Sequence, residues 1–599
     1  MKGACTLRFG RQGWFLVLAL VTSLPGWGQV APLHHWVGFT DKVGCGVDLN
    51  APDAGTQLLS ERALNRRAHH GIPLDSLDLP VAADRIAAVK DLGALENGQA
   101  IRILHRSRWF NGVVIQIDTA VADSADVAAL LNAIASLEGV AELRRAGWYG
   151  VEPIGPASGE AMAKPRLQVE NNSGASAYGA SWAQTKQLRL DLLHGLGYRG
   201  EGLMVGVLDS GFDRVDDNPA FERARNEGRI QIGGNFPNGG ATTPWIYQEH
   251  AHGAMVLSTM LGEVDSAGTS LFLGSAPDAE YVLFRTEDVH WEHLVEEYHW
   301  VAAAERADSM GCDVLNTSLG YSLFDDTTAH HLTSELDGDT FRITEASDIA
   351  ARKGMLVFNS AGNSGNSPWQ KITAPADGDS VLAVGAVDAF GQHASFSSYG
   401  PTADGRIKPD LCATGRNAAY IHPDGSIREG NGTSFSSPIL CGAAVSLWSA
   451  HPEARSWDIR RALLQSASQW TAPDTIRGFG IADLWEAHLI LGGQQPPSNG
   501  GLLVYPNPVT TVHTGLEVVF QEDNLLASAG SPLRWTILDG LGRPMAEGEL
   551  EREKEPLSTM RIDTGALPSG QYILTVQGVP EEDLVKWPTA WARFIVHSP

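Results

Sequence analysis

The sequence predicts an α/β fold with a doubly wound parallel sheet over residues 178–490. Short apolar runs that end at polar or glycine residues are typical of strands buried on both faces. They lie at residues 203–208, 281–285, 314–318, 355–359 and 381–387. Segments with apolar residues at helical spacing, such as 294–310 and 345–353, alternate with these runs. This order predicts parallel strands joined by crossover helices.

A separate α+β domain is predicted over residues 30–150. At 599 residues the chain is too long for one hydrophobic core, so further domains are expected. The predicted strands of this domain are 34–42, 101–117 and 141–146, and its predicted helices are 59–72 and 127–137. The polar, Gly-, Ser- and Ala-rich residues 151–177 predict an exposed linker, a preferred place for proteolytic cleavage.

The C-terminal part predicts a small β-sandwich over residues 502–599. A Gly- and Pro-rich linker at residues 491–501 separates it from the central domain. Residues 535–545 predict a hairpin with Asp539-Gly540 at its turn. Further strands are predicted at residues 562–567, 568–576 and 592–596.

The N-terminus has the pattern of a signal peptide over residues 1–28. Basic residues (Lys2, Arg8 and Arg11) precede an apolar run at 14–24, and small residues follow, with cleavage expected after Gly28. The run is too short to cross a membrane as a helix, and no second candidate follows. We therefore expect an exported protein without a transmembrane segment.

Charge and cysteine content narrow the function classes. The net charge of −26 argues against nucleic-acid binding. Five cysteines, of which Cys5 belongs to the predicted signal peptide, do not form the pattern of a disulfide framework. Cys312 and Cys441 lie in apolar segments, where we expect small buried hydrophobic side chains, although one disulfide stays possible.

A nucleophile is predicted at Ser434. Residues 432–438 read Gly-Thr-Ser-Phe-Ser-Ser-Pro, followed by the small residues Gly442, Ala443 and Ala444. A tight turn followed by Pro438 predicts a helix whose first turn holds the proline. Ser434 would then lie at the helix N-terminus, where the helix dipole favours developing negative charge. A serine of this kind needs a base to activate it.

The base and the acid that orients it are predicted upstream. Residues 203–208 form a buried strand that ends at Asp209, where α/β sheets place their active sites. His252 opens a small, apolar helical segment that runs to Gly262. The chain order Asp209, His252, Ser434 is the order found in subtilisin, and it differs from those of chymotrypsin and the α/β-hydrolases.

With these blocks the chain resembles the subtilisin-like serine protease (subtilase) family over about residues 178–490. Two further blocks lie between the histidine and the serine, as in that family. Residues 312–320 (CDVLNTSLG) resemble its substrate-binding strand, and residues 358–363 (FNSAGN) resemble the block of its oxyanion-hole asparagine. The resemblance implies a subtilisin-like fold with a propeptide-like domain at residues 30–150. The alternative for that domain is an accessory binding domain.

The resemblance also implies the roles of the site residues. Ser434 is the nucleophile, His252 the general base and acid, and Asp209 the residue that orients the histidine. The Asn363 side chain and the Ser434 backbone N–H form the oxyanion hole. The expected substrate-binding residues are Ser318, Leu319, Gly320, Ala361 and Gly362.

We expect no metal ion in the chemistry. The sequence has no HExxH motif and no clustered Cys and His residues, and His250 is interpreted as a solvent-facing loop residue. Structural calcium is common in the resembling enzymes, so it is possible here, without named ligands. The small Ser364 weakly favours a non-basic substrate side chain beside Asn363.

The C-terminal domain resembles the sorting domain of proteins exported by the Bacteroidetes type IX secretion system. Its opening Tyr-Pro-Asn-Pro at residues 505–508 and the strand LPSGQYIL at 567–574 carry this resemblance. The type IX machinery is then an expected partner, and the protein is released or anchored at the cell surface. The alternative is a generic β-sandwich binding module, for carbohydrate as one example.

The expected function is therefore that of a secreted, monomeric serine endopeptidase that acts on proteins or peptides. A non-catalytic binding protein is the alternative, but such a protein has no need to keep all four catalytic groups. A serine esterase of the α/β-hydrolase type is disfavoured by the chain order and by the lack of Gly-x-Ser-x-Gly around Ser434.

Overall fold

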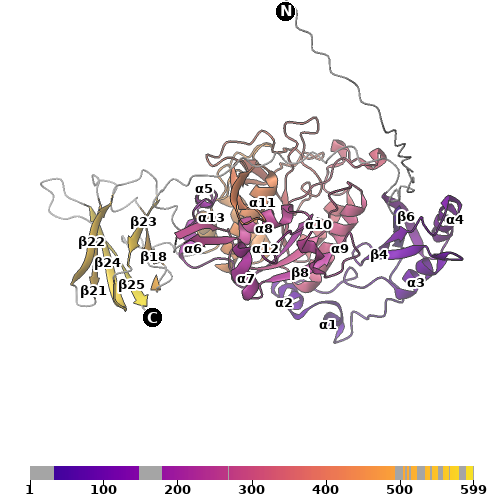
Figure 1. Cartoon of the computed structure of the whole chain (residues 1–599), viewed down its shortest axis with the longest axis horizontal. Coiled ribbons are helices and arrows are strands. Elements are labelled where there is room, and N and C mark those ends of the chain that lie inside the picture. The colour runs from indigo at the N-terminus through magenta and orange to yellow at the C-terminus, as the bar shows by residue number, and fades with distance from the viewer. Residues whose placement is uncertain are drawn as a thin grey trace, which may run out of the picture.

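The computed structural model of the chain describes residues 33–147, 178–266 and 269–492, and separate stretches between 503 and 597 (Figure 1). The predicted signal peptide and the predicted linker at 151–177 lie outside the described residues, as does the linker at 491–501 apart from residues 491 and 492. Among the described residues, no helix is long and apolar enough to cross a membrane.

The central domain is built on a seven-stranded sheet in which every pairing is parallel. Its strand order is β15-β14-β13-β12-β7-β11-β8. The strands are β7 (Met204–Asp209), β8 (Ile230–Asn235), β11 (Glu280–Arg285), β12 (Val314–Thr317), β13 (Leu356–Ser360), β14 (Leu382–Val387) and β15 (Leu411–Thr414). This arrangement confirms the predicted doubly wound α/β sheet.

Helices cover both faces of this sheet (Figure 1). Successive strand residues point to opposite faces, so Val205 and Val207 of β7 join one core, and Met204 and Leu208 join the other. The first core contains α8 (His252–Leu261), α11 (Thr433–Ser449) and α12 (Ser456–Gln465), and the second contains α9 (Val295–Met310) and α10 (Arg342–Arg352). Nearly every residue of α11 is buried, as its uniformly apolar and small sequence indicates.

Smaller elements complete the central domain and the N-terminal domain. In the central domain they are α5 (Trp182–Gln187), α6 (Leu190–Gly195), α7 (Glu222–Asn226), β9 (Glu263–Ser266), β10 (Thr269–Leu273), β16 (Ala418–Ile421), β17 (Ile427–Gly430) and α13 (Leu484–Ile490). In the N-terminal domain they are α1 (Ala54–Leu58), β2 (Ala94–Leu95) and β3 (Gly98–Gln99).

The N-terminal domain is an α+β unit, as predicted. Its sheet has the order β4-β5-β1-β6, and its own core lies between this sheet and its helices. The strands are β1 (Leu33–Phe39), β4 (Ile101–Ser107), β5 (Gly112–Ile117) and β6 (Val140–Gly147), and the main helices are α2 (Glu61–His70), α3 (Ala83–Leu92) and α4 (Ser124–Ala135).

The prediction of one long strand over residues 101–117 is wrong. The structure divides this segment into the antiparallel pair β4 and β5. Asn111 has a φ of 49°, which Asn tolerates better than most residues, and its side chain donates to the Phe39 carbonyl at 2.9 Å. The turn was hidden in the sequence because the apolar Trp109 and Phe110 fill it.

The described part of the C-terminal region contains two sheets. One has the order β18-β20-β23 and the other β19-β25-β24-β21-β22. Their strands are β18 (Leu503–Tyr505), β19 (Val509–Thr510), β20 (Gly515–Gln521), β21 (Leu533–Asp539), β22 (Pro544–Leu550), β23 (Leu557–Asp563), β24 (Gly570–Gly578) and β25 (Thr589–His597). The predicted hairpin is confirmed as β21 and β22, whereas the strand predicted at 562–567 begins and ends earlier, as β23.

The N-terminal domain packs against α9 and α10 of the central domain. The Trp36 ring stacks on the Tyr298 ring of α9 with centroids 5.2 Å apart. The Arg342 guanidinium of α10 lies 4.7 Å from the centre of the Trp36 ring, and it donates to Glu142 at 3.0 Å. Aromatic stacking, a cation–π contact and an ion pair therefore join the two domains at one place.

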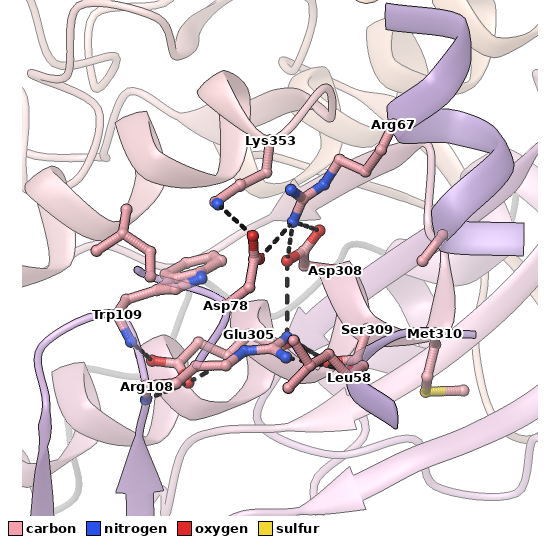
Figure 2. Close-up of polar contacts among 12 residues, drawn as sticks. Leu58, Arg67, Asp78, Arg108, Trp109, Glu305, Asp308, Ser309, Met310 and Lys353 are labelled. Atoms are coloured by element: carbon pink, nitrogen blue, oxygen red, sulfur yellow. Dashed lines mark hydrogen bonds and ion pairs between the residues drawn. The ribbon is translucent and has the colours of Figure 1, made fainter. Parts of the chain in front are cut away.

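A buried ionic cluster forms a second contact between these domains (Figure 2). Arg67 of α2 donates to Asp308 of α9 at 2.8 Å and to Asp78 at 3.1 Å, and Lys353 donates to Asp78 at 3.1 Å. These four side chains are at most 3% exposed, and their charges balance. Beside them, Glu305 accepts from the backbone N–H of Arg108 at 2.9 Å. Each domain thus neutralises charges that the other one buries.

Removing one member of this cluster should destabilise the chain strongly. We expect Asp308→Asn to lower the free energy of unfolding by about 3–5 kcal/mol, because the buried Arg66 and Arg67 both lose their ion pair with Asp308. Urea unfolding of the full chain measures the change. The control is Arg461→Ala, which breaks an exposed pair with Asp458 and should cost about 0–1 kcal/mol. Equal effects of the two substitutions would contradict the assigned importance of the cluster.

The same interface should weaken at acidic pH. Burial lowers the pKa of His34 and of His35 to about 4 and that of His105 to about 3, and the His105 ring lies 5.0 Å from that of His299 on α9. A depressed histidine pKa gives stability that is complete above the ordinary value of 6.5 and is lost as pH falls through about 4.

We therefore expect the thermal midpoint to fall between pH 6.5 and 4, and His105→Gln to flatten this dependence. The matched control is His290→Gln, at an exposed histidine of the central domain, which should leave the dependence unchanged. An unaltered pH dependence in His105→Gln would refute the contribution of this histidine.

Candidate active site

The site lies where the strand order of the central sheet reverses. From β7 the chain continues to β8 and β11 on one side, and then crosses to β12 on the other. Such a reversal opens a crevice at the carboxyl ends of the two neighbouring strands. Asp209 is the last residue of β7, and Ser318 directly follows β12. Both predicted residues thus lie beside this crevice.

Asp209 and His252 are directly hydrogen-bonded. His252 is the first residue of α8, and its Nδ1 lies 2.7 Å from Oδ1 of the fully buried Asp209. The backbone N–H of Ser210 donates to the same oxygen at 2.7 Å. Since Nδ1–H donates to the carboxylate, Nε2 is the basic nitrogen of the neutral ring. The predicted acid and base have the relative placement that their roles require.

Ser434 is the second residue of α11 and is 3% exposed. Pro438 lies in the second turn of this helix, so its predicted place in the first turn is wrong. As proline has no N–H, the Ser434 carbonyl lacks its usual helical donor. It accepts instead from the Ser318 hydroxyl at 3.0 Å, and the Ser434 Oγ donates to the Ser318 carbonyl at 3.3 Å. These bonds tie the predicted nucleophile to the end of β12.

The Asn363 side chain is oriented by Thr433. Its Oδ1 accepts from the backbone N–H of Thr433 at 2.8 Å and from the Thr433 hydroxyl at 3.0 Å. With the oxygen engaged by two donors, the amide nitrogen of this exposed side chain remains to donate elsewhere. Asn363 therefore offers N–H donors next to the residue that precedes Ser434.

The predicted substrate-binding residues follow β12 and β13, at the same edge of the sheet. Gly320 has no room for a side chain, because a Cβ would lie 2.0 Å from the Thr373 hydroxyl. Gly362 has a φ of 104°, and its N–H donates to the Thr433 hydroxyl at 3.2 Å. The Leu319 carbonyl accepts from the Asn359 side chain at 3.1 Å. Ala361 directly follows β13 and is fully buried, and its N–H donates to the Val384 carbonyl at 3.0 Å.

Sequence reasoning missed a carboxylate beside this site. Glu287 lies two residues beyond the end of β11, and it accepts a hydrogen bond from the hydroxyl of the buried Tyr321. Burial raises the pKa of Glu287 to about 7, and the charge of Asp209 adds to the shift. The signal in the sequence is its position, because β11 and β7 are parallel neighbours that end at the same edge of the sheet.

Two further glutamates come close to Glu287. Glu292 and Glu296 place carboxylate oxygens within 4.8 Å of it, an arrangement that could hold a cation. Burial and mutual repulsion raise the pKa of Glu292 to about 9 and that of Glu296 well above its ordinary value. Burial and the closeness of three carboxylates account for these shifts, and the cluster alone does not identify a metal site.

The cysteines behave as predicted within the described residues. Cys312, Cys412 and Cys441 are buried free thiols, and Cys45 is a partly exposed one. Burial raises the pKa of Cys312 and of Cys412 to about 12. These thiols are therefore packing groups and not reactive nucleophiles. His250 is an exposed loop residue, as expected, but its Nδ1 also lies 2.9 Å from the Ser210 hydroxyl.

Comparison with known proteins agrees with this geometry. The model of the subtilase family (Peptidase S8) matches residues 200–480. The model of the Peptidase S8 propeptide domain of Bacteroidota matches residues 34–146, which confirms the predicted propeptide domain over its alternative.

Individual relatives are similar over the central domain. Subtilisin from Bacillus pumilus is 30% identical over 304 residues, covering 50% of this chain and 96% of its own length. Subtilisin DY from Bacillus licheniformis is 28% identical over 286 residues, 47% of this chain and 89% of its own. Among solved structures, the MycP3 protease from the type VII (ESX-3) secretion system is 21% identical with a TM-score of 0.42, covering 56% of this chain and 97% of that one.

A parallel α/β sheet with a subtilase sequence, preceded by a propeptide domain, determines the class of the protein. The chain belongs to the subtilase family and is a serine-type endopeptidase.

Proposed function

We propose that this chain is a secreted serine endopeptidase that hydrolyses peptide bonds through Asp209, His252 and Ser434, by way of an acyl-enzyme. The observation that carries the proposal is the 2.7 Å bond between His252 and Asp209 at the crevice that also holds the N-terminus of α11. The acid, the base and the nucleophile come from three different elements that end or begin at one edge of the sheet.

In the first step, Ser434 Oγ attacks the carbonyl carbon of the scissile bond. His252 Nε2 takes the hydroxyl proton, and the carbonyl electron pair moves onto oxygen. The imidazolium formed in this step is stabilised by Asp209, which stays ionised and holds Nδ1–H. When the tetrahedral intermediate collapses, His252 returns the proton to the leaving amine, and an ester to Ser434 is left.

The oxyanion of the intermediate is stabilised by two donors in this proposal, the Asn363 side-chain amide and the Ser434 backbone N–H. The fixed orientation of Asn363 supports this role, since two bonds from Thr433 hold its oxygen away from the substrate. A donor fixed before the reaction needs no reorganisation as negative charge develops. Water then attacks the ester with His252 again as base, and Ser434 is regenerated.

Substrate binding is proposed to occur by strand addition between Ser318–Gly320 and Ala361–Gly362. Backbone hydrogen bonds to an extended peptide give affinity with little demand on its sequence. The tight packing around Gly320 and the φ of Gly362 support this arrangement, because both keep side chains out of the strand that faces the peptide. Proteins and peptides are therefore the proposed substrates.

We further propose export through a signal peptide at residues 1–28, followed by type IX secretion directed by a C-terminal β-sandwich. The two sheets described between residues 503 and 597 support a β-sandwich, and the sequence resemblance supports its sorting role. The protein would be released or held at the cell surface. Structural calcium and a monomeric state stay predictions.

The nucleophile assignment is tested with the full-length chain and its Ser434→Ala variant on casein. We expect hydrolysis by the parent chain after its propeptide is cleaved, and none above the uncatalysed background by the variant. The size of the purified chain shows whether cleavage has occurred. Hydrolysis by the variant at the rate of the parent would contradict the role of Ser434, and a processed but inactive parent would favour a binding function.

The oxyanion role of Asn363 predicts a loss in kcat. We expect Asn363→Ala to lower kcat by about 10²–10³-fold, the range measured for an oxyanion-hole asparagine in subtilisin. The control is Asn431→Ala, at a residue that accepts a bond from the Asn417 N–H and precedes α11. Steady-state kinetics on a peptide substrate separates kcat from KM. A rise in KM with kcat unchanged would assign Asn363 to substrate binding instead.

A further inference from the structure

Two loops adjoin Asp209, the last residue of β7, and His252, the first residue of α8. One loop leaves β7 at Ser210, and the other leads into α8 through Glu249 and His250. They come from different parts of the chain, so the 2.7 Å bond between the acid and the base depends on what holds the loops together. A displacement of the order of 1 Å at such a site costs about 10²-fold in rate.

The loops contact each other closely. The Ser210 hydroxyl lies 2.9 Å from Nδ1 of His250, and the Asp213 N–H donates to the His250 carbonyl at 3.3 Å. Gly211 has no room for a side chain, because a Cβ would come within 2.5 Å of the His250 backbone nitrogen. These contacts align the loops with each other, but they do not connect the loops to the neighbouring strands β11 and β8.

Arg285 supplies that connection. It is the last residue of β11 and pairs in register with Asp209 on β7. Its side chain is only 4% exposed, and its Nε donates to the Ser210 carbonyl at 3.0 Å. One Nη donates to the Asn235 side chain at the end of β8 at 3.1 Å, and the other lies 3.5 Å from the Glu249 carboxylate.

One guanidinium thus joins the ends of two strands and both loops. Its planar fork of five N–H donors allows contacts in three directions at once, which the single ammonium of a lysine cannot reproduce. Asn235 is fully buried and accepts from the guanidinium at the end of β8. The charge of Arg285 is balanced by Glu249 and, at 3.8 Å, by Asp288.

We propose that Arg285 is a positioning residue for the reaction, which acts by holding the Asp209 and His252 loops at their working separation. This inference rests on the proposed catalytic roles of Asp209 and His252. Arg285 does not reach the substrate in this proposal. It contacts Ser210, which is next to Asp209, and Glu249, which lies three residues before His252. Through these contacts, the ends of the strands set the positions of the two catalytic residues.

Arg285→Lys is the main test, because it keeps the positive charge and removes the fork. Measured on the processed full-length enzyme with a peptide substrate, kcat should fall by about 10–100-fold while KM stays within about twofold. The acid limb of the pH profile of kcat/KM, which reports protonation of His252, should move to lower pH. A carboxylate that is held less well stabilises the imidazolium less, so the pKa of the histidine falls.

Two further variants keep this test decisive. Asn235→Ala removes only the hydrogen bond that the guanidinium donates to the Asn235 side chain. It should also lower kcat, by a smaller factor than Arg285→Lys does. The matched control is Arg229→Lys, at an arginine that donates to the Pro277 and Ala279 carbonyls, each at 2.9 Å, and that contacts neither loop. It should leave kcat and the pH profile unchanged, even if the thermal midpoint falls.

Each result separates this inference from the proposed function. If Arg285→Lys and Arg229→Lys lower the thermal midpoint alike and both keep the parent kcat and pH profile, Arg285 is only structural and the inference is wrong. If Asp209→Asn keeps the activity of the parent, the triad assignment fails first, and the inference fails with it. Loss of kcat in Asp209→Asn and in Arg285→Lys, but not in Arg229→Lys, supports both the catalytic triad and the positioning role of Arg285.

Discussion

The parallel pairing of β7 with β11 on one side and β12 on the other is the constraint on which the rest of the site depends. Parallel strands end at the same edge of a sheet, and the helices that follow them begin there. Asp209 ends β7, Ser318 follows β12, and the helices α8 and α11 begin with residues of the site. Residues more than one hundred positions apart therefore meet, as Ser318 and Ser434 do.

Hydrogen bonds from the backbone and from small polar side chains then refine this placement. Ser318 replaces the donor that Pro438 lacks, and Thr433 holds the oxygen of Asn363. Neither group needs to take part in the chemistry for these contacts to matter. In the proposed mechanism, groups that are fixed in this way before substrate binds leave little reorganisation for the reaction.

The propeptide domain is joined to the enzyme by charges as much as by apolar contacts. Asp308 of the enzyme is buried and pairs with the buried Arg66 and Arg67 of the propeptide domain. Buried ion pairs add little net stability, but an incorrect docking leaves a charge unpaired at a large cost. The cluster therefore favours one arrangement of the two domains, and the aromatic contact of Trp36 with Tyr298 adds apolar attraction to it.

Most strands and helices near the site could be predicted, because buried parallel strands and their crossover helices have strong local patterns. β7, β11, β12 and β13 lie within about one residue of their predicted bounds. β8 and β15 were not predicted; β8 is half-exposed and contains two glycines, which weaken the pattern of a buried strand. The turn before β5 was missed because apolar side chains occupy it, and the place of Pro438 was wrong because a helix can begin before its proline.

The sequence by itself determined the family, the order of the expected catalytic residues and their place at strand ends and helix starts, because these follow from local residue patterns. The tertiary structure alone decided which groups meet across the chain. Three contacts each join elements that are distant in sequence: the hydrogen bond from the Arg285 guanidinium to Ser210, the Glu287–Tyr321 pair and the Arg67–Asp308 pair. No local pattern encodes such contacts, since they arise only when strands pair and domains pack.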